Sequence, residues 1–187
     1  MPRLKAIEVD NAAPAAKALL QGVEKKLGMT PNLMRTMANA PAVLDAFLGF
    51  GNALSKGTLS VKVREQIALT VAELNKCQYC LSAHSAVGKM VGLSDEEIAD
   101  SRRSASPDRK TEAILQFAGK VVSTRGWVSD DDVLALRSAG ATDAELSEIV
   151  GVVAHSIFSN YFNHVAGTKV DFPEVAAPTC ETDCACG

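Results

Sequence analysis

The sequence has no hydrophobic run long enough to cross a membrane and no large excess of charge of either sign. No apolar stretch approaches the roughly 20 residues that a membrane-spanning helix needs. The net charge is −3, and no basic stripe with interleaved aromatic residues favours nucleic-acid binding. The first ten residues, MPRLKAIEVD, lack the apolar core of a signal peptide. We therefore expect a cytoplasmic protein with no membrane or nucleic-acid partner.

The sequence also lacks the alternation of apolar and polar residues that is typical of β-strands. Helix start and stop signals recur instead, including an N-cap at Ser60 and capping boxes that begin at Ser94 and Thr142. The predicted helices span residues 11–27, 31–38, 41–54, 61–74, 77–91, 95–103, 111–125, 130–139 and 142–165. We predict an all-α fold with one helical domain over residues 1–175 and a cysteine-containing flexible tail over residues 176–187.

Cysteine is present in an odd number, five, which argues against a full disulfide framework. In a reducing compartment, a C-x-x-C pair is catalytic or binds metal rather than acting as a structural crosslink. Cys77 and Cys80 form such a pair, and His84 follows four residues later. On a helix these three residues share one face, and His84 lies one turn from Cys80. The pattern favours a redox or metal site over two inert buried thiols.

Each of the two thiols has a reason to be reactive. Cys77 lies near a helix start, where free backbone N–H groups and the helix dipole favour a thiolate. Cys80 has His84 as a possible proton acceptor. Glu65 falls on the apolar face of the preceding helix, among Val61 and its neighbours, and a carboxylate there tends to have a raised pKa. Glu73 is a second candidate carboxylate, and spacing alone does not choose between them.

The stretch EQIALTVAELNKCQYCLSAH, with Glu65, Cys77, Cys80 and His84 at fixed spacings, resembles the signature of the AhpD-like superfamily. This superfamily includes the alkyl hydroperoxidase D proteins and the carboxymuconolactone decarboxylases, and the likeness extends over about residues 30–175. The late stretch NYFNHVAGTKVDFP is similar to the end of the peroxidase-related branch. Tyr79 departs from the pattern, because alkyl hydroperoxidase D proteins have histidine there.

The resemblance implies an AhpD-like helical bundle that reduces alkyl hydroperoxides as an antioxidant enzyme. Glu65 and His84 would form a proton relay for Cys80, and Cys77 would close a disulfide. No metal or organic cofactor is required. A lipoyl or thioredoxin-like partner would return the electrons, and the family's assembly implies a homo-oligomer, a trimer or hexamer. The helix-start argument leaves the reverse order of the cysteines open.

Two other functions fit the same residues. Cys77, Cys80 and His84 could supply three zinc ligands of a structural or regulatory protein, with Glu65 or a tail cysteine as the fourth. The fold could also serve a lyase like the carboxymuconolactone decarboxylases, although those enzymes lack the cysteine pair. Activity that survives replacement of both cysteines would favour the lyase.

The remaining candidate residues lie outside this stretch. Phe47 and Phe50 could line the active site, although aromatic residues at helical spacing usually belong to the core. His155 and His164 are expected as core or interface residues, and Asn160 and Asn163 as partners for buried polar groups at a subunit contact. The C-terminal segment CETDCACG carries three further cysteines, Cys180, Cys184 and Cys186. These thiols could relay electrons to the Cys77–Cys80 pair or bind a metal ion.

Overall fold

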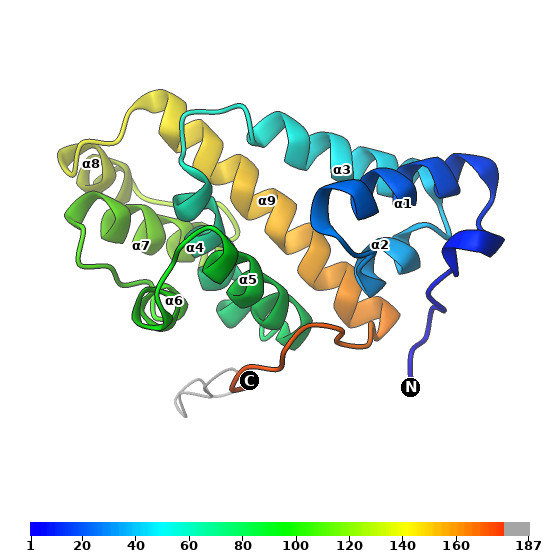
Figure 1. Cartoon of the computed structure of the whole chain (residues 1–187). Helices are drawn as coiled ribbons and strands as arrows, with labels where there is room; N and C mark the ends of the chain where they lie inside the picture. The colour runs from blue at the N-terminus through cyan, green and yellow to red at the C-terminus, as the bar shows by residue number, and fades with distance from the viewer. Residues whose placement is uncertain (178–187) are drawn as a thin grey trace, which may run out of the picture.

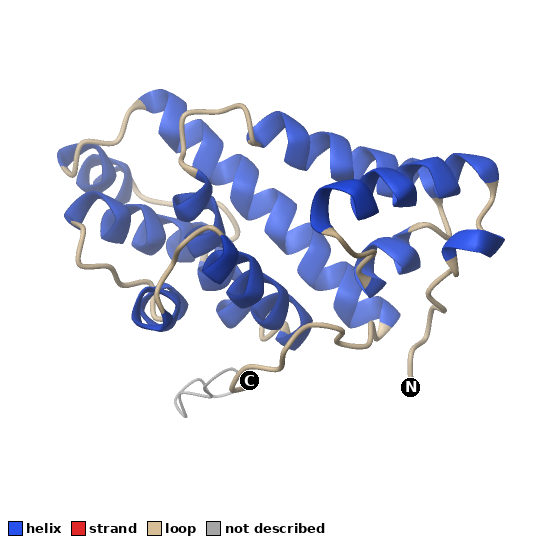
Figure 2. Cartoon of the chain, viewed as in Figure 1, coloured by secondary structure: helices blue, strands red, loops and turns tan. Residues whose placement is uncertain are grey.

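The computed structural model describes residues 1–177, and all regular structure in that range is helical (Figure 2). The α-helices, preceded by a short 3₁₀ helix, η1, at Val9–Asn11, are α1 Pro14–Leu27, α2 Asn32–Met37, α3 Pro41–Leu54, α4 Val61–Leu74, α5 Gln78–Met90, α6 Asp95–Arg102, α7 Arg109–Ser123, α8 Asp130–Ser138 and α9 Asp143–Ala166. The predicted all-α class is confirmed. The three tail cysteines lie outside the described residues.

Helix boundaries follow the local capping chemistry. Ser60 accepts a hydrogen bond from the Val63 N–H as predicted, and both capping boxes are present. The first helix begins at Pro14 rather than at residue 11. The fixed φ angle of proline and its missing N–H suit the first helical position, so α1 starts there and the preceding residues form η1.

Helix α4 lies at the centre of the fold and packs against α5, α6, α7 and α9 (Figure 1). Its residues 66–72 are all buried, so this helix is covered on every side rather than on one stripe. Val61, which the sequence places on the apolar face of this helix, is nevertheless 43% exposed. Val61 occupies the first turn, before α4 enters the interior.

Two clusters of buried side chains form the core, and α4 contributes to both. Leu69 joins side chains of α1, α2, α3 and α5 in one cluster, and Ile67 joins side chains of α7, α8 and α9 in the other. The long helix α9 crosses the fold diagonally, with α7 and α8 on one side and α1, α2 and α3 on the other (Figure 1). A site at the α4–α5 junction is therefore held by the most buried part of the molecule.

The segment after α9 returns across the start of α5. Gln78 Nε2 donates to the Val175 carbonyl oxygen at 2.8 Å, and Arg102 Nη2 donates to the carbonyl oxygen of Ala176 at 3.1 Å. Asp171 accepts a hydrogen bond of 2.7 Å from the Asn32 N–H at the start of α2. These contacts place Phe172 against the ring of Tyr79. Within residues 1–177, no helix is long and apolar enough to span a membrane.

Candidate active site

The turn between α4 and α5 sets the position of both cysteines. Lys76 has a left-handed backbone with φ 53°, and the N–H groups of Lys76 and Cys77 bond to the carbonyl oxygens of Glu73 and Ala72. This Schellman arrangement ends α4 and reverses the chain within two residues. Cys77 becomes the N-cap of α5, and its Sγ accepts from the Cys80 N–H at 3.4 Å. Both thiols thus belong to the positive end of α5.

The two sulfur atoms are buried, with Cys77 and Cys80 each 1% exposed. The side chain of Asn163, from α9, donates from Nδ2 to the Cys80 Sγ at 3.3 Å. Asn160 lies beside it and accepts a hydrogen bond from Asn75. Both asparagines are buried within this chain, and they lie near the Cys80 sulfur because α9 packs against α4 and α5. Their expected role at a subunit contact stays a prediction.

His84 and Glu65 form the closest charged contact at the site. His84 Nδ1 lies 2.7 Å from Glu65 Oε2, and their side chains are 28% and 17% exposed. This contact directs the other ring nitrogen of His84 away from the carboxylate. Glu73 is engaged elsewhere, since its Oε2 accepts from Arg102 Nε at 2.7 Å. The structure thereby selects Glu65 as the carboxylate beside His84.

The two thiols have opposite acidities. A hydrogen bond from the Cys77 thiol, helped by the charge of His84 and the Asn163 amide, outweighs burial and lowers the pKa of Cys80 to about 7. The pKa of Cys77 is strongly raised, because its thiol proton is held in that hydrogen bond to Cys80 and because it is buried. Near neutral pH the thiolate therefore resides on Cys80.

The acidity of His84 supports the same charge distribution. Burial acts to lower the pKa of His84, but the charge of Glu65 and its hydrogen bond outweigh burial, with a further contribution from Cys80. The net effect raises the pKa of His84 above its ordinary value. A protonated imidazole beside Cys80 stabilises the thiolate and can supply a proton to a leaving oxygen.

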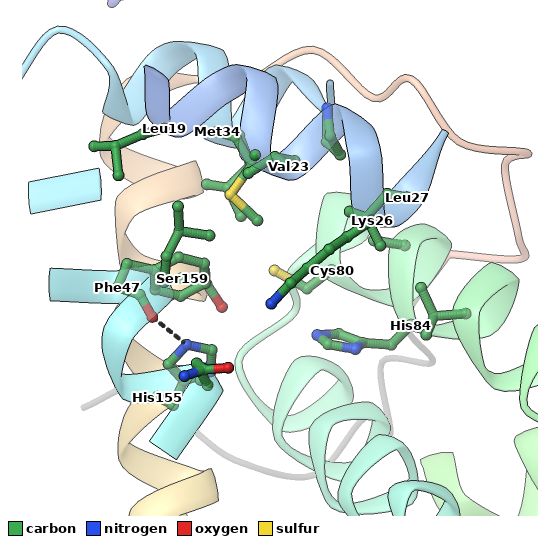
Figure 3. A pocket seen from close by; sticks show the side chains of 18 of the residues that line it. Leu19, Val23, Lys26, Leu27, Met34, Phe47, Cys80, His84, His155 and Ser159 are labelled. Carbon is green, nitrogen blue, oxygen red and sulfur yellow. Dashed lines mark hydrogen bonds between the residues drawn. The ribbon is translucent and has the colours of Figure 1, made fainter. Parts of the chain in front are cut away.

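A cavity of about 550 Å³ opens beside Cys80 (Figure 3). Cys80, His84 and Glu65 line it, whereas Cys77 does not. A molecule in the cavity thus meets the Cys80 sulfur first, with Cys77 behind it. Of the two thiols, Cys80 is therefore the one that the cavity reaches.

The far wall of the cavity comes from α3 and α9. His155 donates from Nε2 to the Phe47 carbonyl oxygen at 3.2 Å and stacks on the Phe47 ring at a centroid distance of 4.2 Å (Figure 3). Burial lowers the pKa of His155. Phe47 and His155 therefore line the cavity in addition to packing, while Phe50 and His164 do not line it.

The hydroxyl group of Tyr79 has a structural role at the start of α2. Its hydroxyl oxygen accepts from the Leu33 N–H at 3.1 Å, and burial raises the pKa of Tyr79. The N-cap of α2 is Pro31, which supplies no side-chain acceptor. Tyr79 and Asp171 together satisfy two N–H groups at the start of α2. A histidine at this position would not reproduce that arrangement.

The side chains that the zinc hypothesis requires do not gather into a ligand set. Among residues 1–177, no group of three or more His, Cys, Asp or Glu side chains is placed to hold a metal ion. His84 is turned toward Glu65, and Cys77 toward Cys80. The possible fourth ligands in the tail are outside the described part of the chain.

Sequence reasoning missed how α9 supplies the thiol environment. Ser156, Ser159, Asn160 and Asn163 are all buried polar residues, and they recur at helical spacing. A buried polar stripe on an otherwise apolar helix indicates that it faces a polar site, and this pattern is visible in the sequence. The contribution of α1 to the cavity leaves no comparable pattern.

The chain is similar to known proteins in both sequence and structure. Residues 41–121 match the model of the carboxymuconolactone decarboxylase family. An AhpD-core, uncharacterized peroxidase-related protein from Ralstonia eutropha JMP134 superposes with a TM-score of 0.80 and 27% identity, covering 91% of this chain and 92% of the other. An uncharacterized peroxidase-related protein from Silicibacter sp. TM1040 has a TM-score of 0.78 and 27% identity, covering 89% and 92%. No curated protein matches the sequence.

The debrominase Bmp8 shares the fold, with a TM-score of 0.78 and 19% identity over 90% of this chain and 92% of Bmp8. The matched family segment contains Glu65, Cys77, Cys80 and His84; three of them line the cavity, and Cys77 lies next to Cys80. The chain belongs to the AhpD-like superfamily, which includes the carboxymuconolactone decarboxylase family.

Proposed function

We propose that this protein is a thiol peroxidase that reduces organic hydroperoxides through Cys80 and Cys77. The observation that carries the proposal is the asymmetry of the pair. The acidic thiol of Cys80 lines the cavity, while the thiol of Cys77 lies behind it and keeps its proton. A peroxidatic thiol needs access and acidity, and a resolving thiol needs only proximity.

In the first step, the Cys80 thiolate attacks the terminal oxygen of the hydroperoxide. An S–O bond forms, the O–O bond breaks, and its electron pair leaves on the alkoxide. Protonated His84, held by Glu65 at 2.7 Å, gives its proton to the alkoxide, and an alcohol is released. Cys80 is left as a sulfenic acid.

In the second step, the Cys77 sulfur attacks the Cys80 sulfur. An S–S bond forms, the S–O bond breaks, and the Cys77 proton leaves with the hydroxyl group as water. Oxidation of Cys80 removes the thiolate that raised the pKa of Cys77, so the resolving thiol becomes more acidic when it is needed. An external dithiol, such as a reduced lipoyl group or a thioredoxin-like protein, then reduces the disulfide by exchange.

The test is a count of free thiols before and after one equivalent of cumene hydroperoxide, with mass mapping of any disulfide. We expect loss of two of the five thiols and a Cys77–Cys80 link. Cys77→Ser should leave a sulfenic acid at Cys80 that dimedone traps, and Cys80→Ser should form no such species. Five unchanged thiols after prolonged exposure would contradict the proposal.

Reductive dehalogenation is a second candidate for the same thiol pair. It is favoured by the size and apolar lining of the cavity and by the shared fold of the debrominase Bmp8. Release of bromide from a bromopyrrole, with oxidation of both thiols and no reaction with hydroperoxide, would replace the peroxidase proposal. Turnover of a lactone by Cys77→Ser/Cys80→Ser protein would indicate a lyase instead.

We further propose that the protein acts in the cytoplasm, where its thiols stay reduced, and as a homo-oligomer. The outer face of α9 carries exposed apolar side chains, among them Phe158, Tyr161 and Val165. Clustered exposed apolar residues favour a protein interface. Light scattering should give a mass of several subunits, and Val165→Glu should reduce it; a monomeric wild type would contradict this assembly.

A further inference from the structure

Lys26 places an unmatched positive charge in the cavity beside Cys80. It belongs to the last turn of α1, lines the cavity, and points its ammonium group into it (Figure 3). Within residues 1–177, the side chain of Lys26 makes no hydrogen bond or ion pair. Glu65 is the one acidic side chain of the lining, and it is engaged with His84. The cavity therefore offers a cation without an anionic partner of its own.

The walls around this cation are largely apolar. Side chains of α1, α2, α3 and α5 supply most of the surface: Leu19, Val23, Leu27, Met34, Leu48 and Val87. The cavity volume of about 550 Å³ falls in the range of pockets that enclose organic ligands, and far exceeds the ~30 Å³ share of one water molecule. Hydrogen peroxide, which is close to water in size, would leave most of this surface unused.

The thiolate itself does not need Lys26 as its counter-charge. The Cys80 sulfur accepts a hydrogen bond from Asn163, and its negative charge is balanced chiefly by the Cys77 thiol and by His84. Lys26 reaches the cavity from α1, and its ammonium group ends near Cys80 and His84 in the view of Figure 3, with no hydrogen bond or ion pair to either in the described part of the chain. Its charge is thus available to a bound molecule.

We propose that the substrate of this site is amphiphilic, an alkyl or aryl hydroperoxide that carries a carboxylate, and that Lys26 binds that carboxylate. The inference rests on the proposed peroxidase function. The apolar body of the substrate packs against α1 and α3, and its peroxide group reaches Cys80. A charge-assisted hydrogen bond at one end and an apolar wall along the body fix the orientation of a small molecule.

A matched pair of substrates tests the proposal: cumene hydroperoxide and its para-carboxylate. The measured quantity is the ratio of kcat/KM for the carboxylate to kcat/KM for the neutral compound. Lys26→Met keeps the length of the side chain and removes its charge. This change should lower the ratio about three- to ten-fold, as expected for a partly solvated charged contact.

Lys25→Met is the control, since Lys25 is an exposed neighbour on α1 that does not line the cavity. It should leave the ratio unchanged. Added salt should lower the ratio in the wild type and in Lys25→Met, because ions screen an exposed charge pair. The ratio in Lys26→Met should respond much less. Equal ratios in all three proteins, at any salt concentration, would overturn the assignment of Lys26.

Binding of the two alcohol products separates this inference from the peroxidase proposal. Calorimetry on Cys80→Ser protein, with and without Lys26→Met, should show the same three- to ten-fold loss of affinity for the carboxylate alcohol. That loss without reduction of either hydroperoxide by the wild type would refute the peroxidase function and retain the anion site. Reduction of both hydroperoxides with no effect of Lys26→Met would support the peroxidase function and refute the anion site.

Discussion

Replacing Glu65 with glutamine removes the charge that keeps His84 protonated while preserving the size of the side chain. The two groups lie 2.7 Å apart and are only partly exposed, so water screens their interaction incompletely. Without the carboxylate, burial dominates at His84 and lowers its pKa. A neutral imidazole no longer stabilises the Cys80 thiolate, and the pKa of Cys80 should rise.

The structure bounds the size of this effect. With a pKa of about 7, about half of Cys80 is thiolate at pH 7, whereas a thiol with an ordinary pKa of about 9 would be about 1% thiolate. If the pKa of Cys80 returned to its ordinary value, reactions of the Cys80 thiolate at pH 7 would therefore slow about 50-fold. The largest contribution, the hydrogen bond from Cys77, remains in Glu65→Gln, so we expect a loss of about ten-fold.

The assay is the rate of Cys80 alkylation by iodoacetamide across a pH series, which reports thiolate content without a peroxide. Glu73→Gln is the matched control, because Glu73 lies on the same helix and is similarly buried but pairs with Arg102. It should leave the alkylation profile of Cys80 unchanged. A folded Glu65→Gln protein with the wild-type profile would refute the coupling of Glu65, His84 and Cys80.

Three further predictions use the same structure. In the wild type, alkylation of Cys80 should rise with pH through a midpoint of about 7 and then level off, because the thiolate is the reactive form; a midpoint above 8 would contradict the lowered pKa. Asn163→Leu, which removes the donor to Cys80 Sγ, should move that midpoint upward, and an unchanged midpoint would remove Asn163 from the thiol environment. Ile149→Ala, at a fully buried core position, should lower the free energy of unfolding by about 2–5 kcal/mol, measured by urea denaturation; a loss under 1 kcal/mol would contradict the packing described.

The sequence alone predicted the helices and most of their ends. Ser60, Ser94 and Thr142 carry their capping chemistry within four residues, so neighbours along the chain decide those boundaries. The spacing of Cys77, Cys80 and His84 likewise predicted one helical face. Residues one turn apart on a helix meet regardless of the rest of the fold.

Only the tertiary structure decided how the residues of the site are arranged. Glu65 and Glu73 are equivalent by spacing, and what separates them is that Arg102 of α6 packs beside Glu73. Which of the two sulfurs faces the cavity depends on distant helices, since α1, α3 and α9 supply much of the cavity wall. Asn163 reaches Cys80 across 83 positions of sequence, and Lys26 enters the same cavity from α1. Such contacts arise from the packing of distant helices, which capping and periodicity do not encode.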